Sequence, residues 1–107
     1  MSDAAEFSGK MGELQKLRVA VVILLSRENS TLLSRRQRVA GKEIEVMCAE
    51  RDRDQGDDPQ AAQKLLDHLY LEDKALRHDL AQTELEIQRM EALMAKVDAD
   101  ILALCQS

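Results

Sequence analysis

The chain has 107 residues, of which 33% are charged, 45% are hydrophobic and 2% are aromatic. This length is enough for one domain and not for two. Four glycines and one proline leave too little turn chemistry for sandwiches, barrels or doubly wound α/β folds, whereas strong helix formers such as Ala, Leu, Glu, Gln and Arg dominate. An all-α protein with long helices is therefore predicted, as a single domain covering residues 1–107.

The charge and the cysteines narrow the function classes further. The formal net charge is −5, and a mildly acidic chain is not expected to bind nucleic acid or anionic membranes as a whole. The longest apolar run, residues 19–25, is too short to span a bilayer and lacks the flanking pattern of a signal peptide. Cys48 and Cys105 lie far apart without a CxxC motif, which is typical of a reducing compartment. We therefore expect a cytoplasmic protein that has no membrane partner.

A first helix is predicted over residues 10–54. Residues 1–10 contain Gly9 and small polar side chains and are expected to fray. Two weak points lie inside the helix: residues 29–31 could cap and restart it, and Gly41 costs about 1 kcal/mol against alanine. One continuous helix is favoured over two shorter ones because it nearly matches the second helix in length. Its coiled-coil seam, interrupted by charges, consists of Phe7, Met11, Leu14, Arg18, Val21, Leu25, Glu28, Leu32, Arg35, Val39, Lys42, Val46 and Ala49.

A turn is predicted at residues 55–58, followed by a second helix over residues 59–106. Gly56 is typical of a helix end, Asp58 is a good N-cap, and Pro59 suits the first position of a new helix. Steps of four and three residues then land almost entirely on apolar side chains, which is the repeat of a coiled-coil seam. These seam positions are Ala62, Leu66, Leu69, Asp73, Leu76, Leu80, Thr83, Ile87, Met90, Met94, Val97, Ile101 and Leu104.

The distribution of charge favours pairing of the two helices within one chain. Residues 1–55 carry ten basic and nine acidic side chains, whereas residues 56–107 carry five and eleven. A parallel homodimer of the second helix would set acidic side chains against one another, whereas an antiparallel hairpin lays basic residues of the first helix beside them. The predicted fold is therefore an antiparallel two-helix coiled-coil hairpin. Asp73 needs a basic neighbour on the seam, for which Arg35, Arg36 and Lys42 lie in range.

A hairpin leaves apolar side chains that one seam cannot bury. Residues 17–25 are apolar on every side except at Arg18, and two leucines lie opposite the seam of the second helix. Because two helices make a thin core, we expect a homodimer when the protein is alone, or a helical protein partner, to complete the fold. Isolated surface leucines are the alternative for Leu71 and Leu85. The predicted partner-binding residues are Leu17, Val21, Val22, Ile23, Leu24, Leu25, Leu71 and Leu85.

No catalytic, cofactor-binding or metal-binding constellation is predicted, and we do not expect an enzyme. His68 and Glu72 are spaced to share a metal ion, but two ligands do not make a site, and a solvated histidine beside a carboxylate is favoured. The basic cluster at residues 35–38 is the one indication of nucleic-acid binding. Because no aromatic side chains accompany it for base stacking, pairing with the acidic second helix is favoured, and a nucleic-acid-binding regulator is the least favoured function.

The start of the second helix reads Asp58-Pro59-Gln60-Ala61-Ala62-Gln63-Lys64-Leu65. This segment resembles the small all-helical chaperones of type III secretion, which are similar also in chain size, scarcity of aromatic residues, acidic balance and two-helix layout. The resemblance implies a cytosolic chaperone that binds an aggregation-prone filament or translocator subunit through coiled-coil contacts. Hairpin stalk proteins of the same machinery also resemble this chain, so a structural component of a larger assembly is the alternative function.

Overall fold

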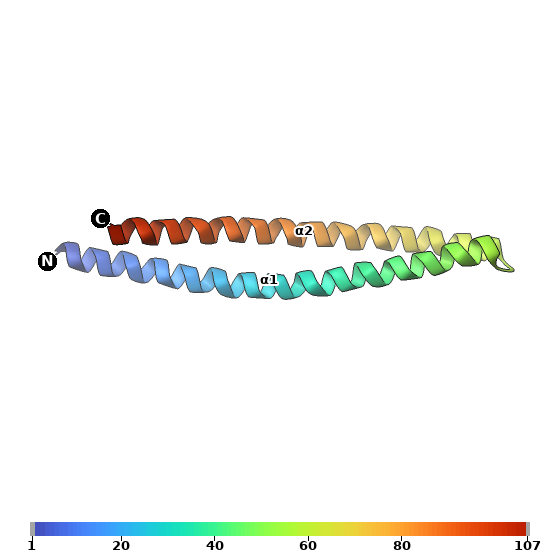
Figure 1. Ribbon diagram of the computed structural model, residues 1–107, viewed down its shortest axis with the longest axis horizontal. Coiled ribbons are helices and arrows are strands. Elements are labelled where there is room, and N and C mark those ends of the chain that lie inside the picture. Colours follow the sequence, from blue (N-terminus) through green and yellow to red (C-terminus); the bar gives the residue numbers. More distant parts are fainter. Residues whose placement is uncertain (1, 107) are drawn as a thin grey trace. The chain divides into compact units, whose positions relative to one another are not determined.

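The computed structural model describes residues 2–106, which form two α-helices and no strand. α1 spans Ser2–Gln55, α2 spans Pro59–Gln106, and a short turn joins them (Figure 1). Ion pairs join Arg18 to Asp98 and Lys42 to Glu72, so residues early in α1 contact residues late in α2. The helices are therefore antiparallel, and the predicted all-α helical hairpin is confirmed. Within the described residues, neither helix has an apolar stretch long enough to cross a membrane.

α1 is longer and more regular than predicted. The predicted start at about residue 10 is wrong, because α1 begins at Ser2. Ala4, Ala5 and Glu6 are strong helix formers, and no proline interrupts the stretch that follows. The helix also continues through residues 29–31 and Gly41. The penalty of about 1 kcal/mol for a glycine is therefore too small to break a helix that packs along its length.

The turn between the helices is stabilised by the residues that predicted it. The Gly56 N–H donates to the Asp52 carbonyl at 2.8 Å, and a Cβ atom added to Gly56 would collide with that same carbonyl oxygen. Glycine is needed here for the close approach of the backbone. Asp58 Oδ1 accepts a hydrogen bond from the Ala61 N–H at 3.1 Å, so Asp58 is the N-cap of α2 and the predicted boundary is confirmed.

The contacts divide the hairpin into two units, which are described separately. Unit 1 comprises the described residues of 1–30 and 85–107, and unit 2 comprises Thr31–Glu84. In each unit a segment of α1 packs against a segment of α2. The buried apolar core of unit 1 contains Val21, Ile87 and Val97, and that of unit 2 contains Val39, Ala49, Leu66 and Leu69.

The burial pattern confirms the predicted heptad register in both helices. Every seam position of α2 from Ala62 to Leu104 is buried or half-buried, including the polar Thr83. Along α1 every seam position is buried or half-buried except Phe7 and Arg18. A shift of one residue would have moved these side chains to the surface, so the repeat of seven identifies the buried face of each helix.

Candidate functional site

The residues predicted to bind a partner fall into two groups. Val21 is 2% exposed and belongs to the core of unit 1, and Leu25 is half-buried on the same side of α1. These two side chains pack inside the hairpin. The exposed group consists of Leu17, Val22, Ile23, Leu24 and Leu85 in unit 1 and Leu71 in unit 2.

Part of the exposed group in unit 1 forms a leucine flank beside the seam. Lys10, Leu17 and Leu24 are spaced seven residues apart along α1, and Glu86, Leu93 and Asp100 have the same spacing along α2. Residues seven apart lie on the same face of a coiled-coil helix. Leu17, Leu24 and Leu93 are 42%, 42% and 41% exposed, so about half of each side chain is covered by the hairpin. We call these six residues the leucine flank.

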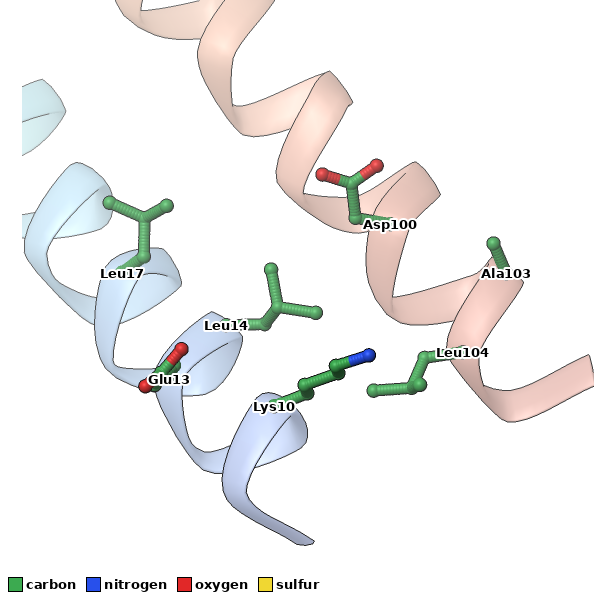
Figure 2. Close-up of a pocket in the computed structure, with 7 residues that line it drawn as sticks. All are labelled: Lys10, Glu13, Leu14, Leu17, Asp100, Ala103 and Leu104. Atoms are coloured by element: carbon green, nitrogen blue, oxygen red, sulfur yellow. The ribbon is translucent and has the colours of Figure 1, made fainter. Parts of the chain in front are cut away.

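A groove of about 540 Å³ lies at one end of the leucine flank. Figure 2 shows Lys10, Leu14 and Leu104 between the two helices, and the groove is lined also by Leu17, Ala103 and the carboxylates of Glu13 and Asp100. Its lining combines the apolar side chains of Leu14, Leu17 and Leu104 with the charged side chains of Lys10, Glu13 and Asp100. This arrangement can accommodate the apolar face of another helix.

A second apolar surface of unit 1 lies on the outer side of α1. Val19, Val22 and Ile23 are 59%, 43% and 47% exposed. Their spacing of three and four residues places them together on one helical face, directed away from the buried Val21. We call these three residues the outer stripe.

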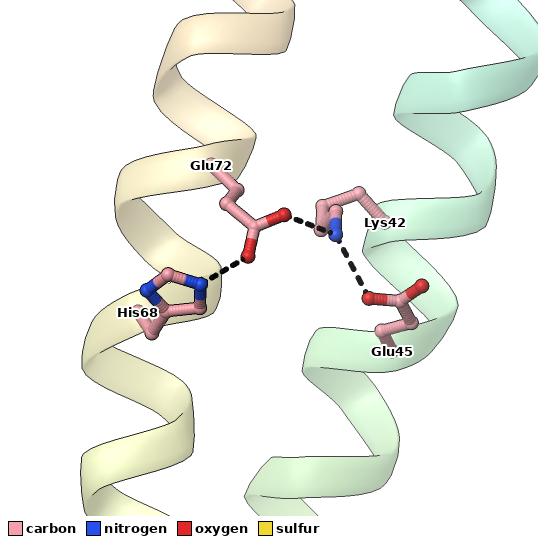
Figure 3. A network of polar contacts seen from close by, with 4 residues as sticks. All are labelled: Lys42, Glu45, His68 and Glu72. Carbon is pink, nitrogen blue, oxygen red and sulfur yellow. Dashed lines mark hydrogen bonds and ion pairs between the residues drawn. The ribbon is translucent and has the colours of Figure 1, made fainter.

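In unit 2, ion pairs occupy the heptad position of the leucine flank. Lys42 Nζ contacts Glu72 Oε2 and Glu45 Oε2, both at 2.9 Å, and His68 Nε2 contacts Glu72 Oε1 at 2.7 Å (Figure 3). Hydrogen bonds to Glu45 and then Glu72 raise the pKa of Lys42, and the hydrogen bond from Lys42 lowers the pKa of Glu72. The Glu72 side chain therefore acts as a structural anion that links the two helices.

The opposite flank of unit 2 is also polar. Arg77 pairs with Glu43 across the helices, and the Tyr70 hydroxyl donates to Glu50 Oε1 at 3.1 Å. Burial, followed by the hydrogen bond to Glu50, raises the pKa of Tyr70. Both flanks of unit 2 thus satisfy polar side chains within the hairpin.

The predicted partners of Asp73 are wrong. Asp73 Oδ2 accepts a hydrogen bond from Arg77 Nε at 2.9 Å on its own helix, whereas Lys42 turns to Glu72. Arg35 donates to the Thr83 hydroxyl and to the Asp79 carbonyl. Asp73 Oδ1 is left buried without a hydrogen-bond partner among the described residues. The four-residue spacing on α2 brings Arg77 closer than any cation across the seam.

An apolar surface on unit 2 was missed in the sequence. Ile44 and Met47 are 63% and 68% exposed, and with Cys48 and Arg51 they line a shallow pocket on the outer side of α1. The spacing of three, four and seven residues was readable from the sequence. The pattern was overlooked because the buried seam residues Val46 and Ala49 lie between its members in the sequence.

The metal-ligating side chains of the described residues are scattered along the two helices. No three His, Cys, Asp or Glu side chains in residues 2–106 come together in a way that could hold a metal ion. His68 is largely exposed and pairs with a helical carboxylate, as the sequence led us to expect. Arg36 and Arg38 are exposed, whereas Arg35 is half-buried against α2.

Comparisons with protein-family models, with curated proteins and with solved structures find no match to this chain.

Proposed function

We propose that this protein is a non-enzymatic coiled-coil interaction protein that binds a helical protein partner through unit 1. The observation that carries the proposal is the exposure of five apolar side chains within eight consecutive residues of α1: Leu17, Val19, Val22, Ile23 and Leu24. Exposed leucines and valines are common singly. A cluster of this density beside an apolar groove is typical of an interaction surface.

Burial of this surface would contribute favourable free energy to binding. Fully burying one such side chain contributes about 1.5–3 kcal/mol, and these five are each roughly half exposed. Leu17 and Leu24 lie on the leucine flank and Val19, Val22 and Ile23 on the outer stripe, so one amphipathic helix can cover one of these two faces. Covering the outer stripe would contribute a few kcal/mol before the cost of association is subtracted. A partner helix with apolar residues at three-, four- and seven-residue spacing would match the surface.

The most concrete version of the proposal is a small cytosolic secretion chaperone. Such a protein would cover the apolar face of an aggregation-prone helical client until the client is secreted. The resemblance at residues 58–65 supports this version. The two free cysteines, Cys48 and Cys105, support it as well, because free thiols are typical of a reducing compartment. The exposed surface around Ile44 and Met47 favours the alternative of a structural component, because it would allow a second contact within a larger assembly.

The basic cluster is part of the same proposal. Arg35 contacts Thr83 and the Asp79 carbonyl. These contacts support a role of the cluster in binding α2 within the hairpin, in place of a role in binding nucleic acid. We therefore expect no affinity for duplex DNA or RNA that survives physiological salt. A micromolar affinity that falls steeply with added salt in a fluorescence titration would favour the regulator instead.

The test compares two surfaces of equal chemistry. Tagged wild-type protein is used to capture a partner from the source cells, and binding is then measured with the purified partner. We expect the double variant Val22→Gln/Ile23→Gln to bind about tenfold more weakly or worse. The matched control is Leu102→Gln, an exposed apolar position on α2, which should bind like wild type. A partner without an amphipathic helix, or equal losses in both variants, would refute the proposal.

A further inference from the structure

We propose that the turn at residues 56–58 is built to keep each chain closed as a hairpin. Its residues prevent α1 and α2 from joining into one long helix, a form in which α1 of one copy would pair with α2 of a second copy. The inference concerns the turn and the buried seam, so it goes beyond the proposed function and does not depend on it.

An exchanged pair of chains would keep the contacts of the closed hairpin. In unit 1 the ion pair of Arg18 and Asp98 would form between two chains, and in unit 2 so would the ion pair of Lys42 and Glu72. For this reason the exchange of identical elements between copies is a low-cost route to dimers. Because the seams contribute equally to both forms, the turn decides between them at a given protein concentration.

Gly56 favours the closed form in two ways. Its N–H donates to the Asp52 carbonyl at 2.8 Å, and a Cβ atom at this position would collide with the same backbone oxygen. The closed turn therefore requires a residue without a side chain. Glycine is also a poor helix former, because its backbone loses more freedom on folding than that of any other residue. This property disfavours a helix that continues through residue 56.

Asp58 and Pro59 favour the closed form as well. Pro59 is the first residue of α2, a position at which no helical hydrogen bond needs its missing N–H. In a joined helix its ring would clash with the Gln55 carbonyl, which would also lose its N–H donor. Asp58 Oδ1 accepts a hydrogen bond from the Ala61 N–H at 3.1 Å. That N–H is free only at the start of a helix, so a joined helix would lose this cap.

The spacing of the two seams is a third obstacle to joining. Ala49 in α1 and Ala62 in α2 are buried and half-buried seam positions, and their separation is one residue short of two full heptads. Each residue turns a helix by about 100°, so the two seams of a joined helix would face directions about 100° apart. Two straight antiparallel copies could not bury both seams.

The test removes these obstacles together. The open variant carries Gly56→Ala and Pro59→Ala, and one alanine is inserted between Asp57 and Asp58 to bring the two seams into line. We expect this variant to form a dimer of two long antiparallel helices. The matched control carries the inserted alanine alone. It should remain a closed hairpin, because Gly56 and Pro59 are kept and one extra residue in a turn is tolerated.

Energy transfer between two dyes distinguishes the closed form from the exchanged form. One dye is attached to Cys105 and the other to a cysteine placed by Lys10→Cys, while Cys48→Ser removes the remaining thiol. In the closed hairpin Lys10 lines the same groove as Leu104, so the two dyes lie close together. In an exchanged chain they lie near opposite ends of one helix, about 140 Å apart. Labelled chains are diluted into unlabelled chains, so that only transfer within one chain is measured.

We expect strong transfer in wild type and in the control at low and high protein concentration. The open variant should show almost no transfer, and its sedimentation should give the mass of a dimer. A wild-type dimer that keeps strong transfer consists of two closed hairpins and supports the inference.

Three results would overturn the inference. The first is strong transfer or a monomeric mass in the open variant, and the second is transfer that is lost from wild type as the protein concentration rises. The third is loss of the helices of the open variant in circular dichroism, because it would mean that the seams cannot form between two chains.

Discussion

The two units place different chemistry at the same heptad position. In unit 1 this position holds the three leucines Leu17, Leu24 and Leu93 together with Lys10, Glu86 and Asp100. In unit 2 it holds one leucine, Leu65, together with Thr31, Arg38, Glu45, Glu72 and Asp79. Unit 2 pairs polar side chains across both flanks and exposes apolar residues such as Ile44 and Met47 only elsewhere on its surface, whereas unit 1 exposes leucines on the flank itself. The two units of one two-helix architecture therefore differ in how much of this flank is polar and paired within the hairpin.

Charged substitutions in the seam should cause the largest losses of stability in both units. Leu80→Asp in unit 2 and Ile87→Asp in unit 1 should each lower the free energy of unfolding by about 3 kcal/mol, because a carboxylate would be placed in a desolvated row. Hydrogen exchange should show that Ile87→Asp loses protection first in unit 1, while unit 2 keeps its ion pairs and capped turn.

The matched controls for the seam are Gln82→Asp and Gln88→Asp, since both glutamines are exposed. Thermal melts of these controls should lie close to wild type. If the controls lose as much stability as the seam variants, the heptad register is wrong.

Removing cations that link the helices should have intermediate effects that differ between the units. Arg35→Met in unit 2 should cost about 1–2 kcal/mol, because the half-buried guanidinium bonds to Thr83 and to the Asp79 carbonyl. Arg18→Met in unit 1 should cost less than about 0.5 kcal/mol, since its pair with Asp98 is half exposed on both sides. Urea unfolding of both variants measures the difference, and equal losses would contradict the contrast between the units.

Asp73→Leu should stabilise unit 2 by about 1 kcal/mol. The substitution removes a carboxylate oxygen that is buried without a hydrogen-bond partner among the described residues and places an apolar side chain in the seam. Urea unfolding checks the sign, and the matched control is Asp67→Leu on the exposed side of α2. A destabilised Asp73→Leu variant would mean that the pair with Arg77 contributes more than burial of the carboxylate costs.

The smallest expected effect is the change in the stability of unit 2 with pH. Lys42 lowers the pKa of Glu72 below its ordinary value of 4.5, so the folded state holds the charged form more strongly than the unfolded state does. The resulting stability is present above that ordinary value and is lost as the pH falls through the lowered pKa. The difference in unfolding free energy between wild type and Glu72→Gln should therefore shrink on acidification. A difference that is independent of pH would contradict this assignment.

Local chemistry made much of the fold predictable. The repeat of seven identified the buried face of both helices, and Gly56, Asp58 and Pro59 identified the turn, because each signal needs only neighbours along the chain. The antiparallel arrangement followed from the charge difference between the two halves. The start of α1 was placed too late, because Gly9 and the small polar residues around it were weighed without the packing that follows them.

The surfaces were harder to predict because they depend on contacts between the helices. The sequence indicated that residues 17–25 could not all be buried, but it did not separate the leucine flank from the outer stripe. Leu93 was missed because one leucine outside a seam carries no signal until Leu24 is placed level with it. Asp73 was given partners across the seam, although the closer cation lay four residues along its own helix.

The contact between Arg18 and Asp98 has a consequence for synthesis of the chain. The two residues are separated by 80 positions, and a ribosome adds about 5–20 residues per second, so roughly 4–16 s pass between them. During that interval the apolar segment at residues 17–25 has already been synthesised, while the part of α2 that packs against it has not yet been translated. Unit 2, whose helices are joined directly by the turn, can close earlier. The apolar surface of unit 1 is therefore most open to capture by another helix while the nascent chain is still on the ribosome.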